Sequence, residues 1–268
     1  MMLFIRHYLL AVQFFTRIPI TGRLAEWAGF SPAMLRASAG HFPGVGVLVG
    51  AAAAGVYALF AVLLPATTFT PLVAAVLSTI ATVLLTGGFH EDGLADVADG
   101  LGGGNDKARA LEIMKDSRVG AFGAMALSLA LLCKVALVAL LGSTETELLT
   151  LCSALFAAHV VSRTAPLLLI AWLPHVGDSA ASKSKPLANQ ISSSSLLTAF
   201  VWCFIAIALV LYVQDATVLI VACSLSLVCL LWMHRLFKRR LQGFTGDCLG
   251  ATQQVCEIAF YLGLAIAL

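Results

Sequence analysis

The sequence has few charged residues. Asp, Glu, Lys and Arg make up 11% of its 268 residues and hydrophobic residues 60%, whereas soluble domains carry about 25% charged residues. This composition argues against a soluble fold. The formal net charge is only +2, and the Lys and Arg residues are scattered. We therefore expect no nucleic acid partner, because a nucleic-acid binder needs a concentrated basic surface.

The sequence also lacks the cysteine patterns of zinc and disulfide sites. Its seven cysteines form no CxxC pair and no Cys/His cluster, and most lie inside apolar runs, where they pack as small hydrophobic side chains. The apolar N-terminal stretch ends in Thr16-Arg17-Ile18-Pro19 without a small-residue cleavage site. We expect neither a disulfide nor a zinc site, and we expect the N-terminus to form a short interfacial helix.

Long apolar runs dominate the rest of the chain. A membrane helix needs about 20 apolar residues to cross a hydrocarbon core of about 30 Å. Runs of this kind lie at residues 45–64, 71–89, 120–141, 148–173, 196–213, 217–233 and 253–268. The fifth and sixth runs are short enough to form one helical hairpin that turns at Gln214 and Asp215. The sequence predicts an all-α integral membrane protein, a polytopic bundle of about seven transmembrane helices, in one domain (1–268).

Lys and Arg are absent from every second connection. Connections 65–70, 142–147 and 214–216 contain neither residue. All Lys and Arg residues except Lys134 and Arg163 lie in the N-terminal segment or in the loops 90–118, 174–195 and 234–252. Because cytoplasmic loops carry the excess of Lys and Arg, these loops are predicted to face the cytoplasm. The chain then lies in the bacterial cytoplasmic (inner) membrane with a cytoplasmic N-terminus and an external C-terminus.

An acidic stretch follows the second predicted span, at residues 90–100 (HEDGLADVADG). On a helix, Asp92, Asp96 and Asp99 fall within about 60° of one another. Such close carboxylates repel unless a cation neutralises them, and Mg²⁺ prefers carboxylates that leave room for waters and phosphates. The stretch predicts a Mg²⁺ site with Asp92, Asp96, Asp99 and the adjoining Glu91 as candidate ligands. A merely solvated helix end is the alternative.

Other polar residues lie where loops meet the membrane. Lys115, Asp116 and Arg118 precede the third span and are either a phosphate clamp or an ordinary basic flank. Asp247 precedes the seventh span and either caps that helix or joins the acidic group.

Ionisable residues inside predicted spans point to function, because their burial in lipid is expensive. Arg163 lies roughly 14 Å from its cytoplasmic end, too deep to snorkel, so we expect it to contact substrate. Glu257 either pairs with Arg163 or a basic loop, or forms a structural ion pair. Lys134 is expected to snorkel outward or to form a structural hydrogen bond. His159 is expected to be a hydrogen-bonded residue of the bundle.

Several motifs, in order along nearly the whole chain, resemble the cobalamin (5'-phosphate) synthase family, also called adenosylcobinamide-GDP ribazoletransferases. They are residues 13–19 (QFFTRIP), 42–46 (FPGVG), 86–90 (TGGFH), 92–96 (DGLAD), 99–100 (DG), 112–118 (EIMKDSR), 162–163 (SR) and 245–251 (TGDCLGA). Glu91 departs from the pattern, since some relatives carry an apolar residue there.

The resemblance implies a Mg²⁺-dependent transferase in the nucleotide loop assembly of cobalamin biosynthesis. A hydroxyl of α-ribazole, or of its 5'-phosphate, attacks the cobinamide-linked phosphorus of adenosylcobinamide-GDP, and GMP leaves. Phosphoryl transfer asks mainly for positioning and charge neutralisation. The implied catalytic residues are Asp92, Asp116 and Asp247, and the implied substrate-binding residues are His90, Lys115, Arg118 and Arg163.

Two other classes of function remain open from the sequence. A divalent-cation or proton-coupled transporter also places carboxylates and an Arg in a membrane bundle, but its site usually lies near the bilayer midplane. A non-catalytic scaffold has no use for converging carboxylates. Expected partners are membrane lipid and either a second copy of the chain or other membrane-bound enzymes of the corrinoid pathway.

Overall fold

The computed structural model describes residues 2–267 except 105, 145–146 and 178–190, and this part of the chain is almost entirely helical. The described elements are α1 (Met2–Phe15), α2 (Gly22–Ala28), α3 (Pro32–Ser38), the 3₁₀ turn η1 (Ala39–His41), α4 (Phe42–Leu63), α5 (Thr70–Thr86), α6 (Phe89–Gly103), α7 (Lys107–Ile113), α8 (Ala121–Ser143), α9 (Leu148–Trp172), α11 (Ser193–Val210), α12 (Ala216–Arg240) and α13 (Gly246–Ala267). One isolated bridge pairs His175 with Phe244.

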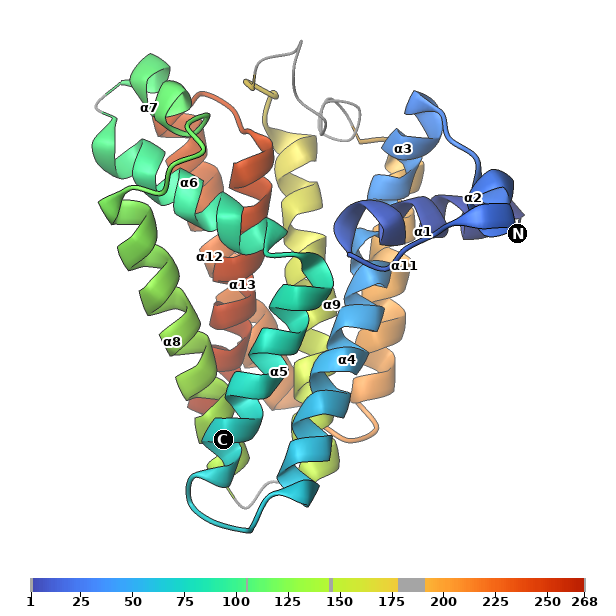
Figure 1. The fold of residues 1–268 in the computed structure, drawn as a ribbon, viewed down its shortest axis with the longest axis vertical. Helices are drawn as coiled ribbons and strands as arrows, with labels where there is room; N and C mark the ends of the chain where they lie inside the picture. Colours follow the sequence, from blue (N-terminus) through green and yellow to red (C-terminus); the bar gives the residue numbers. More distant parts are fainter. Residues whose placement is uncertain (1, 105, 145–146, 178–190, 268) are drawn as a thin grey trace.

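The long helices run side by side as a bundle, while α1 and α6 lie across its upper end in Figure 1. Six helices are long and apolar enough to cross a membrane, and α5 passes the same test only together with α6, from which it is bent by 90°. The chain is therefore a multi-pass membrane protein with up to seven spans and a short N-terminal helix. The predicted fold class is confirmed.

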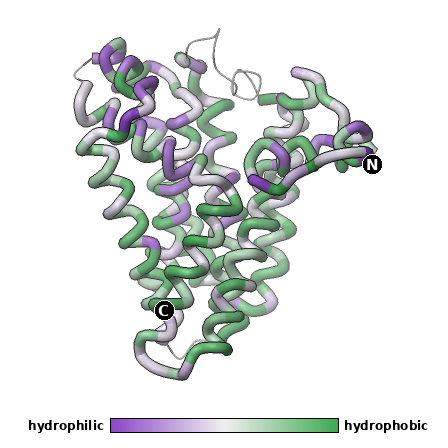
Figure 2. The backbone as a smooth tube through the Cα atoms, in the orientation of Figure 1, coloured by the Kyte–Doolittle hydropathy of each residue, from purple (hydrophilic) through white to green (hydrophobic). Residues whose placement is uncertain are grey.

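The outer faces of the bundle expose large apolar side chains. Leu129 and Leu132 on α8, Phe204 on α11 and Val228 on α12 are each more than half exposed. Figure 2 shows hydrophobic residues along the shafts of the helices, with hydrophilic residues gathered at the end that carries α6 and α7. Lipid covers such faces in a membrane, whereas their exposure to water would be energetically unfavourable.

Two glycines turn the chain between α5 and α6. Gly87 and Gly88 both have left-handed backbone angles, with φ of 71° and 69°, which glycine adopts without steric cost. The backbone N–H of Arg17 donates to the carbonyl of Leu85 at 2.7 Å and holds the N-terminal segment against this turn. The predicted second span, 71–89, was therefore wrong at its end, because the helix stops at Thr86 and the acidic stretch forms a separate crosswise helix.

The last spans also differ from their predicted bounds. The predicted spans 217–233 and 253–268 are α12, which continues to Arg240, and α13, which begins at Gly246. Apolar run length underestimates both helices because each extends into polar sequence. The predicted turn at Gln214 and Asp215 lies between α11, which ends at Val210, and α12, which begins at Ala216. Above this turn α11 packs mainly against α4 and α9, and α12 packs mainly against α13. Most of the predicted loop 174–195, residues 178–190, lies outside the described residues.

Close contact between α4 and α9 forms the centre of the bundle. A Cβ atom at Gly46 would lie 2.9 Å from the Cα of Val160 and closer still to the carbonyl of His159. The two backbones touch here, as they do where small residues drive association of membrane helices. Gly55 lies on the same helix with nothing within 4 Å of a Cβ.

We predict that Gly46→Val separates α4 from α9 and destabilises the bundle by about 1–3 kcal/mol, the usual cost of overpacking. Gly55→Val is the matched control and should behave as wild type. The measurement is the midpoint of SDS-induced unfolding in mixed micelles. Equal midpoints for the two variants would mean that the α4–α9 contact does not hold the bundle together.

Candidate functional site

The helices α6 and α13 bring acidic side chains together at the polar end of the bundle. A Cβ atom at Gly93 would lie 2.8 Å from the carbonyl oxygen of Asp247 and 3.1 Å from its Cα, so the two backbones touch. Asp92 is exposed on α6, and Asp96 and Asp247 are half-buried. Asp247 lies in the first turn of α13 and accepts a hydrogen bond from Thr245 Oγ1 at 3.2 Å.

These carboxylates act on one another electrostatically. Burial and, in decreasing order, the charges of Asp247, Asp92 and Asp99 together raise the pKa of Asp96 to about 7. A carboxylate surrounded by three others is the arrangement that a cation relieves. The predicted acidic group is therefore present, and Asp247 belongs to it.

Asp99 also accepts hydrogen bonds from the backbone at the start of α8. Its side chain is buried, Oδ2 accepts from the backbone N–H of Gly120 at 2.7 Å, and Oδ1 accepts from Gly123 at 2.8 Å. A carboxylate that receives the first N–H groups of a helix stabilises that helix. Asp99 thereby fastens α6 to α8.

The donor set suits Mg²⁺ bound by few protein ligands. Among the described residues, no three His, Cys, Asp or Glu side chains lie close enough to hold a metal ion by themselves. Mg²⁺ usually takes one or two carboxylates and completes its shell with waters and substrate phosphates. Asp92 and Asp96, with Asp247 opposite them, fit that mode, and metal binding by these residues and by Asp99 stays a prediction.

Glu91 lies apart from the aspartates. It is buried, and Gln254 Nε2 on α13 donates to its Oε1 at 3.0 Å. Successive residues on a helix point about 100° apart, so Glu91 faces the bundle while Asp92 faces water. The structure gives Glu91 a place in the interior polar network and no place beside Asp92 and Asp96.

An ion pair lies at the centre of this interior network. Lys134 Nζ on α8 is 2.6 Å from Glu257 Oε1 on α13, and both side chains are buried. Gln253 Nε2 donates to Glu257 Oε2 at 2.7 Å and to Ser162 Oγ at 3.1 Å. Of the two expectations for Lys134, the structural bond is confirmed and outward snorkelling was wrong, because the buried carboxylate of Glu257 offers a partner that lipid cannot. Glu257 has the structural role that the sequence left open.

Arg163 is buried one helical turn beyond His159. Its Nη1 lies 3.0 Å from His159 Nδ1 and donates to the His159 carbonyl at 3.0 Å. Its guanidinium carbon is 5.7 Å from the ring centre of Phe42, and Nε has no partner in the part of the chain that the structure describes. Arg163 thus keeps capacity for an anion, and its contact with substrate stays a prediction.

The loop before α8 carries an exposed ion pair. Arg118 Nη2 lies 2.6 Å from Asp116 Oδ2, and hydrogen bonds from Arg118 lower the pKa of Asp116 to about 2. Both residues line an open groove of about 610 Å³ that also reaches Asp99 and Arg109. Asp116 is a weak base in this state. Lys115 is exposed at the end of α7.

Sequence reasoning missed Gln253 and Gln254. Both are fully enclosed in α13 and join Glu91 to Glu257 through hydrogen bonds. They lie at the beginning of the predicted seventh span, where polar residues indicate the end of an apolar run. The signal was Thr245, whose Oγ1 accepts from the backbone N–H of Cys248 at 3.4 Å in the manner of an N-cap, directly before the helix that begins at Gly246.

These features define a multi-pass helical membrane protein with a carboxylate site at the polar end of its bundle. Residues 7–265 match the protein family described as "Cobalamin-5-phosphate synthase". The chain therefore belongs to this family. It is 70% identical over 276 residues to the adenosylcobinamide-GDP ribazoletransferase of Polaromonas sp., which covers 99% of this chain and 98% of the relative.

More distant relatives carry the same name. The ribazoletransferase of Polaromonas naphthalenivorans is 69% identical over 278 residues, with all of both chains covered. That of Vibrio cholerae is 42% identical over 257 residues, covering 95% of this chain and 91% of the relative. No solved structure matches. The resemblance inferred from the motifs is confirmed, and the transporter and scaffold alternatives lose their support.

We predict that Asp99→Asn destabilises the protein by about 1.5–3 kcal/mol, because an amide nitrogen cannot accept from a backbone N–H and a charge-assisted bond is lost. Asp92→Asn is the matched control on the same helix and should not lower stability, since Asp92 is exposed among like charges. SDS-induced unfolding measures both. A wild-type midpoint for Asp99→Asn would contradict the capping role.

Proposed function

We propose that this chain joins α-ribazole, or α-ribazole 5'-phosphate, to adenosylcobinamide-GDP and releases GMP, which gives adenosylcobalamin or its 5'-phosphate. Family membership makes the chain a transferase of cobalamin biosynthesis. The observation that carries the proposal is the group of mutually repelling carboxylates on α6 and α13, at the polar end of a membrane bundle. Phosphoryl transfer from a diphosphate requires neutralisation of its negative charge, and a cation bound to such a group of carboxylates provides it.

The reaction forms a bond between a nucleoside hydroxyl oxygen and the cobinamide-linked phosphorus, and it breaks the bond from that phosphorus to the oxygen that leaves with GMP. Asp92 and Asp96 would hold Mg²⁺, which would neutralise the charge of the diphosphate. A carboxylate must accept the hydroxyl proton. Asp247 suits this task better than Asp116, because Arg118 occupies Asp116 and lowers its pKa to about 2.

The remaining candidate residues surround this centre on different sides. Arg118 lines the open groove, where its guanidinium offers a planar fork to phosphate. Lys115 is three residues before Arg118 in the chain. Arg163 lies deeper, with Nε unpartnered within the described chain. His90 is next to the aspartates in sequence and faces a separate crevice. We assign substrate binding to all four.

The protein is proposed to lie in the bacterial cytoplasmic membrane with the carboxylate site on the cytoplasmic side. The N-terminus lies near the end with α6, and the C-terminus lies at the opposite end (Figure 1). The connections 106–118 and 241–245, which contain or follow basic residues of the described chain, lie at the α6 end in Figure 1, in keeping with the charge bias of cytoplasmic loops. Lipid is the partner of the apolar shafts, and a second copy or another corrinoid-pathway enzyme is proposed beside it.

We predict that GMP release by the purified protein requires Mg²⁺ and stops with excess chelator. Asp92→Asn and Asp96→Asn should each lower the rate constant by about 100-fold or more, because metal charge stabilisation is worth several kcal/mol. Glu26→Gln on α2 is the control for loss of one carboxylate and should keep wild-type turnover. Full activity in chelator would contradict the metal role.

We predict the orientation from labelling single cysteines in a background without the seven native ones. Thr68→Cys and Asp215→Cys should react with an impermeant maleimide added to intact cells. Lys107→Cys and Arg239→Cys should react only after permeabilisation. The reverse pattern would place the carboxylates outside, away from cytoplasmic nucleotides.

A further inference from the structure

The open groove described above lies between α6, α7 and the start of α8, at the polar end of the bundle (Figure 1). Its volume of about 610 Å³ is within the range of about 300–1,000 Å³ that small-molecule sites span. Charged side chains and an aromatic ring line it: Arg109, Glu112, Asp116, Arg118 and Phe122. Asp99 lines it as well, so the groove has room for a nucleotide and reaches the carboxylate group.

Contacts between helices hold the walls of the groove in place. Arg240 Nη2 on α12 donates to the carbonyl oxygens of Leu101 at 3.1 Å and Gly104 at 2.7 Å, at the end of α6. A Cβ atom at Gly104 would lie 2.7 Å from the Cα of Ala110, so α7 packs closely on this end of α6. A groove that is already formed loses little entropy when a ligand binds.

The charged side chains of the groove are paired with one another at its surface. Arg109 Nη1 lies 2.8 Å from Glu112 Oε2, and both side chains are exposed. The pair of Arg118 with Asp116 is the second one. Exposed ion pairs contribute little to stability, so a ligand can replace either partner at small cost. The groove therefore offers guanidinium donors and carboxylate acceptors to the same ligand.

Phe122 gives the groove an aromatic surface. Its side chain is 49% exposed and packs against the end of α6, where a Cβ atom at Gly102 would lie 2.6 Å from its Cγ. Aromatic side chains beside a positively charged groove are the usual platform for nucleobases, because every base has a face that stacks. A base, a phosphate and hydrogen-bond donors thus each find a partner here.

The carboxylate of Glu112 distinguishes between the bases of the two substrates. Guanine presents N1–H and N2–H₂ on one edge, and an ionised carboxylate has two oxygens that accept such donors. The base of α-ribazole is a benzimidazole, which offers a ring nitrogen as an acceptor only and would meet the lone pairs of Glu112. The lining therefore suits guanine.

We propose that the groove binds the guanosine half of adenosylcobinamide-GDP, with guanine stacked on Phe122 and its N1–H and N2–H₂ donated to Glu112. The proposal rests on the proposed function, in which a guanine nucleotide is the leaving group. Arg118 binds the guanosine-linked phosphate through its planar fork. The diphosphate then extends from the groove toward Asp92 and Asp96, which places the cobinamide-linked phosphorus at the carboxylates.

The first test is equilibrium binding of radiolabelled GMP and AMP to the full chain in nanodiscs with Mg²⁺. Wild type should bind GMP about tenfold more tightly than AMP, because adenine has an acceptor at N1 where guanine has a donor. Glu112→Gln should weaken GMP binding by about tenfold and bring the two affinities together, since the amide also donates. Glu26→Gln on α2 is the matched control and should bind GMP as wild type.

Equal affinities of wild type for GMP and AMP, or unchanged GMP binding in Glu112→Gln, would overturn the proposal. The arginines would then serve phosphate alone, whether from a nucleotide or from a lipid headgroup.

The second test is Phe122→Leu, which keeps an apolar side chain and removes the stacking surface. The Kd for GMP should rise by about fivefold or more, and in the transfer assay KM should rise for adenosylcobinamide-GDP and stay unchanged for α-ribazole. Phe204→Leu on α11, an exposed ring on the lipid-facing side, is the matched control and should match wild type. Unchanged GMP binding in Phe122→Leu would overturn the stacked position of guanine. If wild type releases no GMP in the transfer assay, the proposed function fails, and these binding measurements still decide on the groove.

Discussion

The right-angled turn at Gly87 and Gly88 determines where the carboxylates of α6 lie. Without it the acidic stretch would continue along the axis of α5, out of the bundle and away from α13. With it, α6 lies across the polar end, so that one side of the helix meets water and the other meets the interior. Asp92 and Asp96 then face Asp247, and Glu91 enters the bundle. The left-handed backbone conformation, which glycine adopts without steric cost, thus places the carboxylates of α6 at the polar end of the membrane bundle.

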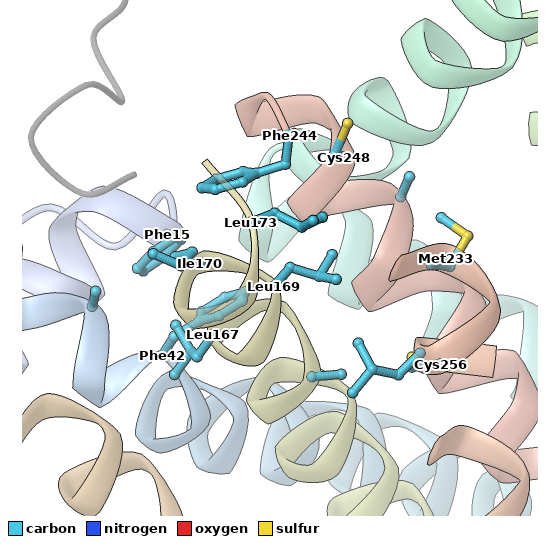
Figure 3. Packing of buried hydrophobic residues seen from close by; sticks show 14 of the residues in the cluster. Phe15, Phe42, Leu167, Leu169, Ile170, Leu173, Met233, Phe244, Cys248 and Cys256 are labelled. Atoms are coloured by element: carbon cyan, nitrogen blue, oxygen red, sulfur yellow. The ribbon is translucent and has the colours of Figure 1, made fainter. Parts of the chain in front are cut away.

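The interior beneath α6 obeys the rule that lipid offers no partner to a polar group. Lys134 and Glu257 pair with each other, and Gln253 and Gln254 carry hydrogen bonds onward to Glu91. Helices α6, α8 and α13 are thereby linked through side chains, in addition to the apolar packing around Leu169 and Phe244 in Figure 3. Removal of one member would leave the next one buried and unpaired, which is costly in a membrane.

The sequence predicted the membrane class, most spans and the acidic group, because run length and helical spacing are local properties. It misplaced the ends of the spans at Thr86, Arg240 and Gly246, where polar residues continue a helix or glycines stop one. It could not show that Asp99 reaches the first turn of α8, since that contact depends on how two helices pack. The partner of Lys134 was hidden for the same reason, because Glu257 is distant from it in the chain.

The opposite environments of Glu91 and Asp92 have a consequence for how this helix can change over evolution. Inserting or deleting one residue before them would rotate α6 by about 100°, which would bring a charge into the bundle and expose the interior carboxyl to water. The same rotation would withdraw Asp99 from the amides of Gly120 and Gly123. The length of α6 is thus fixed as firmly as its composition, and changes in chain length have to be absorbed by the connections between spans.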